Sequence, residues 1–277
     1  MSFINDLKGI FYPRTLTCSV CKRENFNGKT VCDGCYESLP FQSGAICDHC
    51  GRATYFPTEY CDYCKNKQSF IDGARSVYRY EEPINTLIQR LKYGGERYLA
   101  EEFALEMRDV FLRFAVDIDG VVFVPATKSR IFLKGYNQGE EIAKEFSKLV
   151  EIPIIENALE KSKETQSQVG LSVKERKKNL RGSFKVIDKK AISGKNILIV
   201  DDVMTTGSTA EALAEKLKNA GANKVYLLTV ASVCFLKWSN FDKTGEKIDE
   251  NQIDGNNFVQ KKVKNGKILH NYHLKRL

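Results

Sequence analysis

The sequence predicts an α/β fold in which helices flank a parallel sheet and a small metal-binding module precedes it. Three observations lead to this prediction. Cysteines cluster at regular spacing within the first 66 residues, β-branched runs alternate with amphipathic segments from about residue 70, and one such run leads through an acidic pair into a helix over residues 196–220. Strands that alternate with helices form right-handed crossover units in a parallel sheet.

The cysteine module is predicted to bind two metal ions. Eight of the nine cysteines form four Cys-x-x-Cys pairs, a spacing that lets a tight turn aim two thiolates at one tetrahedral Zn²⁺. One pair could be a redox motif, but four in so short a segment indicate structural zinc. Consecutive pairing would give a double ribbon, and a cross-braced arrangement stays open. The expected ligands are Cys18, Cys21, Cys32, Cys35, Cys47, Cys50, Cys61 and Cys64.

Composition limits the kinds of partner and the cellular location that we expect. The net charge of +8, from 43 Lys and Arg against 35 Asp and Glu, favours anionic partners such as phosphorylated molecules, nucleic acid or a membrane surface. A solvated Lys-rich surface is the alternative. We expect a cytoplasmic protein, because no apolar run approaches the ~20 residues that span a bilayer and the N-terminus lacks a signal-peptide core. Disulfides are then not expected, and Cys234 is predicted to be a buried core thiol.

The elements of the α/β domain follow in order along the chain. Apolar alternation predicts strands, and apolar residues at helical spacing predict helices. Gly94-Gly95 separates the first two helices, and Pro125 ends the second strand. We expect strands over residues 74–80, 120–124, 152–155, 196–202 and 224–231, and helices over residues 82–93, 97–114, 137–150 and 208–220.

Other segments fall outside this alternation. Residues 3–11 predict a short amphipathic helix that packs on the protein's own body. Residues 161–181 are polar and exceed the usual connection of ~4–6 residues, which suggests a functional loop or lid. Residues 236–277 are polar and predict a tail. The expected organisation is a double zinc-ribbon module over 1–66, an α/β domain over 67–235 and a tail over 236–277.

A phosphate-binding turn is predicted at the end of the strand over residues 196–202. A helix N-terminus offers unpaired N–H groups and a positive dipole end to a phosphate, and Gly207 lets the backbone approach closely. Because two carboxylates at the strand end suit the hydroxyls of a ribose, we predict a ribose 5-phosphate site. The alternative is an acidic turn with a Ser/Thr helix cap. The expected binding residues are Asp201, Asp202, Val203, Met204, Thr205, Thr206, Gly207, Ser208 and Thr209.

Cations elsewhere are candidates for further ligand contacts. Lys128, Arg130 and Lys134 lie just beyond a buried strand, where they could hold a pyrophosphate group or form an exposed basic loop. Lys92 lies before a Gly pair, where a Lys also complements a helix C-terminus. The densest positive run predicts contact with phosphate or single-stranded DNA, against the default of a solvated surface. It comprises Lys174, Arg176, Lys177, Lys178 and Arg181.

Together these motifs resemble a known family. Residues 200–209 are similar to the 5-phosphoribosyl 1-pyrophosphate (PRPP) motif of type I phosphoribosyltransferases. The paired cysteines, Leu91-Lys92-Tyr93-Gly94, Gly135-Tyr136-Asn137-Gln138 and Asn179-x-Arg181-Gly182-x-Phe184 precede that motif in order. Across roughly residues 12–234 the chain is identified as a member of the ComF family of phosphoribosyltransferase-like competence proteins.

The resemblance implies a double zinc ribbon before a type I phosphoribosyltransferase fold. It implies that Asp201 and Asp202 face the ribose, and are the catalytic residues of an active enzyme, while Thr205–Thr209 hold the 5-phosphate. The loop near Lys128 and Arg130 would face pyrophosphate, Lys92 would join the PRPP site, and Mg²⁺ would accompany PRPP. Thr127 departs from the family, because His is common there.

The same resemblance implies a role in natural transformation, in which the protein handles incoming single-stranded DNA together with an ATP-driven DNA translocase. Two other functions are alternatives. The chain could be a working phosphoribosyltransferase with an unidentified acceptor, or a regulator that senses a phosphoribosyl ligand in the same pocket.

Overall fold

A computed structural model describes residues 16–65, 68–161 and 182–234 of the chain. The cysteine module contributes the short helices α2 (Asp33–Tyr36) and α3 (Asp62–Lys65). Further helices are α4 (Ile84–Tyr93), α5 (Leu99–Phe114), α6 (Lys128–Lys134), α7 (Gln138–Val150) and α9 (Ser208–Asn219). The strands are β1 (Gly73–Arg79), β2 (Gly120–Phe123), β3 (Leu159–Lys161), β4 (Phe184–Val186), β5 (Asn196–Met204) and β6 (Lys224–Ser232).

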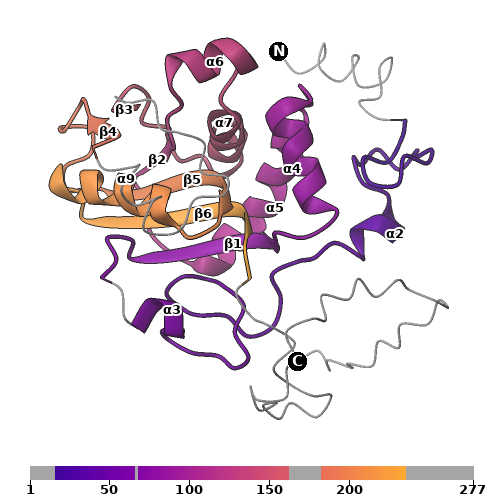
Figure 1. The fold of residues 1–277 in the computed structure, drawn as a ribbon, viewed down its shortest axis with the longest axis horizontal. Helices are drawn as coiled ribbons and strands as arrows, with labels where there is room; N and C mark the ends of the chain where they lie inside the picture. Colours follow the sequence, from indigo (N-terminus) through magenta and orange to yellow (C-terminus); the bar gives the residue numbers. More distant parts are fainter. Residues whose placement is uncertain (1–15, 66–67, 162–181, 235–277) are drawn as a thin grey trace, which may run out of the picture. The chain divides into compact units, whose positions relative to one another are not determined.

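A four-stranded parallel sheet in the order β1-β6-β5-β2 forms the centre of the α/β domain (Figure 1). In the middle of β5, Ile199 is paired with Leu227 of β6 and with Val122 of β2. Since all four strands are parallel, their carboxyl ends share one edge, where ligands bind in such sheets. The predicted fold class, a parallel sheet with flanking helices, is confirmed.

The two faces of the sheet bury different helices because side chains alternate along each strand. Leu198 and Val200 of β5 pack into the core that α4, α5 and α7 complete. Ile197 and Ile199 point to the opposite face and pack against α9, which contributes Leu213 among others. Each fully buried side chain of this size contributes about 1.5–3 kcal/mol, so the sheet is held from both sides.

Three sequence predictions are corrected by the fold. The expected strand over residues 152–155 does not form, since Ile154 makes only an isolated bridge to Val121 and Pro153 has no N–H to donate to a ladder. The basic loop after Pro125 folds in part into α6, and β3 and β4 form an unforeseen antiparallel two-stranded sheet. Cys234 is partly exposed rather than buried.

Several predictions concern residues that the structure does not describe. The helix over residues 3–11, the polar segment from residue 162 to residue 181 and the tail from residue 235 onward all lie outside the described ranges. Within those ranges, no helix has both the length and the apolar composition that crossing a membrane requires.

Candidate functional site

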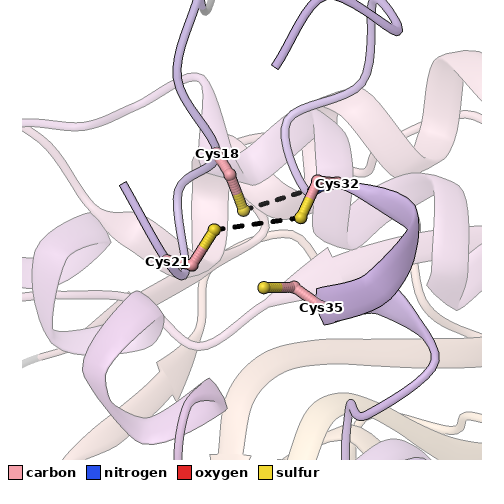
Figure 2. Close-up of side chains that lie close together, drawn as sticks. All are labelled: Cys18, Cys21, Cys32 and Cys35. Carbon is pink, nitrogen blue, oxygen red and sulfur yellow. Dashed lines mark hydrogen bonds between the residues drawn. The ribbon is translucent and has the colours of Figure 1, made fainter. Parts of the chain in front are cut away.

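The eight paired cysteines form two separate clusters. Cys18, Cys21, Cys32 and Cys35 make one, and Cys47, Cys50, Cys61 and Cys64 make the other, with all ligand atoms of a cluster within 4.8 Å of one another. Figure 2 shows the four sulfur atoms of the first cluster turned toward a common centre, with Cys35 contributed by α2. The consecutive pairing is therefore the one adopted, and the cross-braced alternative is not.

The geometry of both clusters fits structural Zn²⁺. Zinc bonds of about 2.3 Å to a tetrahedron of thiolates place the sulfurs about 3.8 Å apart. The Sγ atoms of Cys21 and Cys32 are 3.9 Å apart, and those of Cys50 and Cys61 are 3.8 Å apart. Four cysteines fill the coordination shell and leave no open position for catalysis.

Backbone N–H groups stabilise the thiolate form that the metal requires. The N–H of Cys32 donates to Cys18 Sγ at 3.4 Å, and the N–H of Cys61 donates to Cys47 Sγ at 3.2 Å. Burial by itself would raise the pKa of Cys18, but the backbone N–H groups of Cys32, Cys21 and Val20 outweigh it and lower that pKa to about 6. We call residues 18–36 the first ribbon and residues 47–64 the second ribbon.

The acidic pair lies at the carboxyl end of β5 and is tied to two helices. Asp202 is only 4% exposed, and its Oδ1 lies 2.8 Å from Lys92 Nζ of α4. Its Oδ2 accepts a hydrogen bond of 2.9 Å from Gln138 Nε2 at the start of α7. Lys92 therefore forms an ion pair with Asp202 and does more than complement the C-terminal end of its helix.

The two carboxylates differ in their electrostatic environment. Burial, followed by the charge of Asp202, raises the pKa of Asp201 to about 7. Burial also acts to lower the pKa of Lys92, but the charge of Asp202 outweighs it, so the pKa of Lys92 is raised. Asp202 is therefore committed to an ion pair, whereas Asp201 is available to a ligand and titrates near neutral pH.

The turn after β5 has the form that an anion site requires. Thr205, Thr206 and Gly207, which we call the phosphate loop, connect β5 to α9. Gly207 has a φ of 74°, in the left-handed region that favours glycine. Thr206 Oγ1 lies 2.8 Å from Ser208 Oγ, which opens α9. The expected residues Asp201, Val203, Met204, Thr205, Gly207, Ser208 and Thr209 line a small pocket here.

The basic candidates are distributed unevenly around this pocket. Arg130 lies on α6, exposed, and Lys128 is the first residue of the same helix. The sequence analysis did not identify Lys161 of β3 as a site residue. Burial, followed by the charge of Arg130, lowers the pKa of Lys161, and the charge of Asp201 acts in the opposite direction. The predicted DNA-contacting residues Lys174, Arg176, Lys177, Lys178 and Arg181 lie outside the described residues.

The structure shows the role of the motif Gly135-Tyr136-Asn137-Gln138, which the sequence did not reveal. Asn137 caps α7 by accepting the N–H of Gly139 at 3.1 Å, and its side-chain amide donates to the carbonyl oxygen of Val124 at 3.0 Å. This cap fixes the start of α7, from which Gln138 reaches Asp202. Gln138 could have been identified from the sequence because it belongs to this motif, whereas no sequence pattern marks Lys161.

Comparison with known proteins agrees with this fold and with the zinc ribbons. The phosphoribosyl transferase domain matches residues 119–260, and the double zinc ribbon domain matches residues 7–66. The chain therefore belongs to the phosphoribosyl transferase domain family, with a double zinc ribbon ahead of that domain.

Curated relatives make the assignment more specific. Competence protein F of Haemophilus influenzae is 29% identical, over 73% of this chain and 90% of that protein. DNA utilization protein YhgH of Escherichia coli strain K12 is 29% identical, over 75% of this chain and 86% of that protein. Competence protein ComFC of Streptococcus pneumoniae is 27% identical, over 70% and 82% respectively. The predicted resemblance to the ComF family is confirmed.

A solved structure of the glutamine PRPP amidotransferase from B. subtilis is 23% identical to this chain, with a TM-score of 0.32. The similarity covers 47% of this chain and about a quarter, 26%, of that enzyme.

Proposed function

We propose that this protein is an accessory factor of natural transformation that binds single-stranded DNA, and that the pocket at the end of β5 binds a PRPP-type ligand. The relatives support a competence-related role, because competence and DNA utilization proteins are similar to this chain over 90% and 86% of their length. The observation that carries the ligand assignment is the acidic pair beside the phosphate loop.

Each part of the proposed ligand has a matching group in the chain. The N–H groups of the phosphate loop and of the first turn of α9 suit the 5-phosphate. The carboxylate of Asp201 suits the ribose hydroxyls, while Lys92 and Gln138 hold Asp202 beside it. Carboxylate oxygens are the donors that Mg²⁺ prefers, so Asp201 would face a cation that arrives with the ligand's phosphates and neutralises their charge.

Calorimetry of PRPP binding in the presence of Mg²⁺ tests the pocket. Replacing both carboxylates, Asp201→Asn with Asp202→Asn, keeps their shape and removes their charge, so binding should fall by more than about tenfold. Asp188→Asn, an exposed carboxylate in the turn after β4, is the matched control and should bind as wild type does. Equal binding by all three proteins, or no binding by wild type at millimolar ligand, would reject the pocket.

An active phosphoribosyltransferase is the second candidate, because the carboxylate of Asp201 lines the same pocket as the phosphate loop. Release of pyrophosphate from PRPP with a panel of acceptors identifies an enzyme. Binding without release, together with a ligand-dependent change in DNA affinity, identifies a regulator.

Exposed aromatic side chains next to cations support binding of single-stranded DNA. Phe132 of α6 is 88% exposed and Tyr93 of α4 is 70% exposed. The ammonium of Lys134 lies 4.2 Å from the centre of the Tyr93 ring. Aromatic rings interleaved with cations are the usual platform on which unpaired bases stack. This surface is a second candidate beside the predicted cluster at Lys174–Arg181.

Fluorescence anisotropy with a labelled oligonucleotide separates the two surfaces. Stacking is worth about 1–3 kcal/mol per base, so Phe132→Ala with Tyr93→Ala should weaken binding by roughly fivefold or more. Leu112→Ala, 65% exposed on α5, is the control. Charge reversal at Lys174, Lys177 and Lys178 should instead flatten the salt dependence, which is about −0.7 per phosphate contact on a log–log scale. Unchanged binding by both sets would exclude both surfaces.

The ATP-driven DNA translocase is the partner that the ComF resemblance implies. Co-purification of the full chain with the translocase of the same organism tests this contact. Normal transformation frequency in a deletion strain would argue against the entire DNA-uptake function.

A further inference from the structure

The second ribbon holds the phosphate loop by its main chain. Arg52 Nη2 donates a hydrogen bond of 2.6 Å to the carbonyl oxygen of Thr205. The Tyr63 hydroxyl donates a hydrogen bond of 2.6 Å to the carbonyl oxygen of Thr206. Arg52 is only 4% exposed, and its guanidinium lies 4.9 Å from the centre of the Tyr63 ring. Two donors from the second ribbon thus form hydrogen bonds with the carbonyl oxygens of two consecutive residues of the phosphate loop.

Both donors are placed by the second metal cluster. Arg52 follows the ligand Cys50 by two residues, and its carbonyl oxygen accepts the N–H of Cys47 at 2.9 Å. Tyr63 immediately precedes the ligand Cys64 in α3. Because a bound metal fixes the backbone at its ligands, it also fixes the points from which these two side chains start.

The second ribbon is in turn attached to the sheet. The N–H of Ala74 in β1 donates to the carbonyl oxygen of His49 at 2.7 Å, and Arg75 Nη1 donates to the carbonyl oxygen of Asp48 at 2.7 Å. Just after the ribbon, Ser69 and the N–H of Phe70 donate to the carboxylate of Glu211 in the first turn of α9. The ribbon is therefore connected to β1, and residues 69–70 after it are connected to the helix that follows the phosphate loop.

The orientation of these two carbonyl groups determines the direction of the N–H groups that follow them in the loop. In a trans peptide the C=O and the following N–H point in opposite directions. Since the carbonyls of Thr205 and Thr206 face the ribbon, the N–H groups of Thr206 and Gly207 face away from it. A flip of either peptide would turn a carbonyl oxygen toward a bound anion and would break the hydrogen bond to Arg52 or Tyr63.

We propose that Arg52 and Tyr63 are positioning residues that hold the phosphate loop in its anion-binding orientation, so that 5-phosphate binding depends on the metal cluster of the second ribbon. This inference rests on the proposed phosphate site. The first ribbon is the internal comparison, because its hydrogen bonds run to α4, to Tyr98 and to α5, and none described for residues 18–36 reaches the phosphate loop. Tyr36 of that ribbon donates to Glu106 of α5 at 3.0 Å, and Ser19 is bonded to Tyr98 at 3.0 Å.

The test removes one hydroxyl from each ribbon of the full zinc-loaded chain. Tyr63→Phe keeps the ring over Arg52 but loses the bond to Thr206, so affinity for ribose 5-phosphate should fall by roughly three- to tenfold in calorimetry. Tyr36→Phe loses the same group from the first ribbon and should bind as wild type does. Both variants should retain two zinc ions per chain, which separates positioning from loss of the metal.

A second pair of variants gives an independent measurement. Arg52→Gln should weaken binding, and Arg52→Lys, which keeps a charged donor, should restore part of it. The amide NMR signals of Thr206 and Gly207 should shift on titration of wild type with ribose 5-phosphate, and should shift less in Tyr63→Phe.

The outcomes distinguish this inference from the proposed function. If wild type does not bind ribose 5-phosphate, the phosphate site itself is wrong. If wild type binds, and Tyr63→Phe and Arg52→Gln bind equally well with unchanged zinc content, the phosphate site stands and the positioning role is overturned.

Discussion

The two zinc ribbons have the same ligands at the same spacing, yet they hold different parts of the domain. The first ribbon contacts α5 through side chains, as in the pairs Thr30 with Glu102 and Tyr36 with Glu106, and the carbonyl oxygen of Ser19 accepts a hydrogen bond from Arg90 of α4. The second ribbon contacts the main chain of the phosphate loop through Arg52 and Tyr63. A side-chain contact on the outer surface of a helix adds stability, whereas a main-chain contact at a ligand loop also sets the direction of its donors.

This difference teaches that a structural metal can act on a site without facing it. Neither zinc cluster contributes a ligand position to the candidate pocket, since four cysteines fill each shell. The second cluster nevertheless fixes two donors, and those donors fix two peptide groups of the loop. The first cluster has the same chemistry, but among the hydrogen bonds described for residues 18–36 none reaches the phosphate loop.

The largest expected effect comes from removing one metal at a time. Cys61→Ser should lower the zinc content from two ions per chain to one and weaken ribose 5-phosphate binding by at least about tenfold, because both hydrogen bonds to the loop lose their support. Cys21→Ser should lose one zinc ion as well but keep its ligand affinity within about twofold. Metal analysis and calorimetry on the same samples measure both quantities.

Near-ultraviolet circular dichroism controls this comparison, because it reports whether the α/β domain remains packed in each variant. Equal loss of ligand affinity in two well-folded variants would show that the ribbons do not differ in the way their contacts suggest.

Local patterns in the sequence account for the parts of the molecule that could be predicted. The cysteine spacing allowed two pairings, of which the structure adopts one, and the alternation of strands and helices located the sheet within a few residues. The turn at Asp201–Thr209 was identifiable because all its groups are contiguous. In contrast, Arg52 and Thr205 are 153 positions apart in the chain, and nothing in a run of residues indicates that they meet.

The contacts that local patterns did not reveal have the same origin. Lys92 was expected at the PRPP site through the family resemblance, and its ion pair with Asp202 forms because α4 packs on one face of the sheet that contains β5. The charges of Arg130 and Asp201 act on Lys161 of β3, and the polar sequence around this residue concealed the pairing of β3 with β4. Contacts that depend on tertiary packing require the register and the angle of whole elements, which a single sequence does not specify.

A pH series tests whether the acidic side of the site acts independently of the ribbon. Burial and Asp202 raise the pKa of Asp201 to about 7, from about 3.9 in an unfolded chain. Between about pH 4 and pH 7 the folded state then binds more protons than the unfolded state, so this group lowers the free energy of unfolding as pH rises, and its effect is constant above pH 7. The contribution is at most about 4 kcal/mol.

Urea unfolding at pH 4.5, 6 and 7.5 measures this contribution as a difference between variants. Asp201→Asn should gain stability over wild type as pH rises, since an amide cannot carry the buried charge. Tyr63→Phe should follow the pH dependence of wild type, because its hydroxyl contacts the loop and not the carboxylates. Parallel curves for wild type and Asp201→Asn would contradict the raised pKa.

The smallest expected effect compares one glycine from each ribbon. Gly28 of the first ribbon and Gly51 of the second have similar φ values, 74° and 68°, so alanine is strained at both by about 1 kcal/mol. They differ in space: no described atom lies within 4 Å of a Cβ at Gly28, whereas a Cβ at Gly51 would lie 2.4 Å from the carbonyl oxygen of Ala74. Gly51→Ala must push the second ribbon away from β1 and should cost about 1–3 kcal/mol more than Gly28→Ala in urea unfolding.

The same displacement should loosen Arg52 and weaken ribose 5-phosphate binding slightly, by about two- to threefold, while Gly28→Ala leaves it unchanged. Equal stability losses for the two variants would mean that the second ribbon is not closely docked on β1, and its control of the phosphate loop would then lack a fixed support.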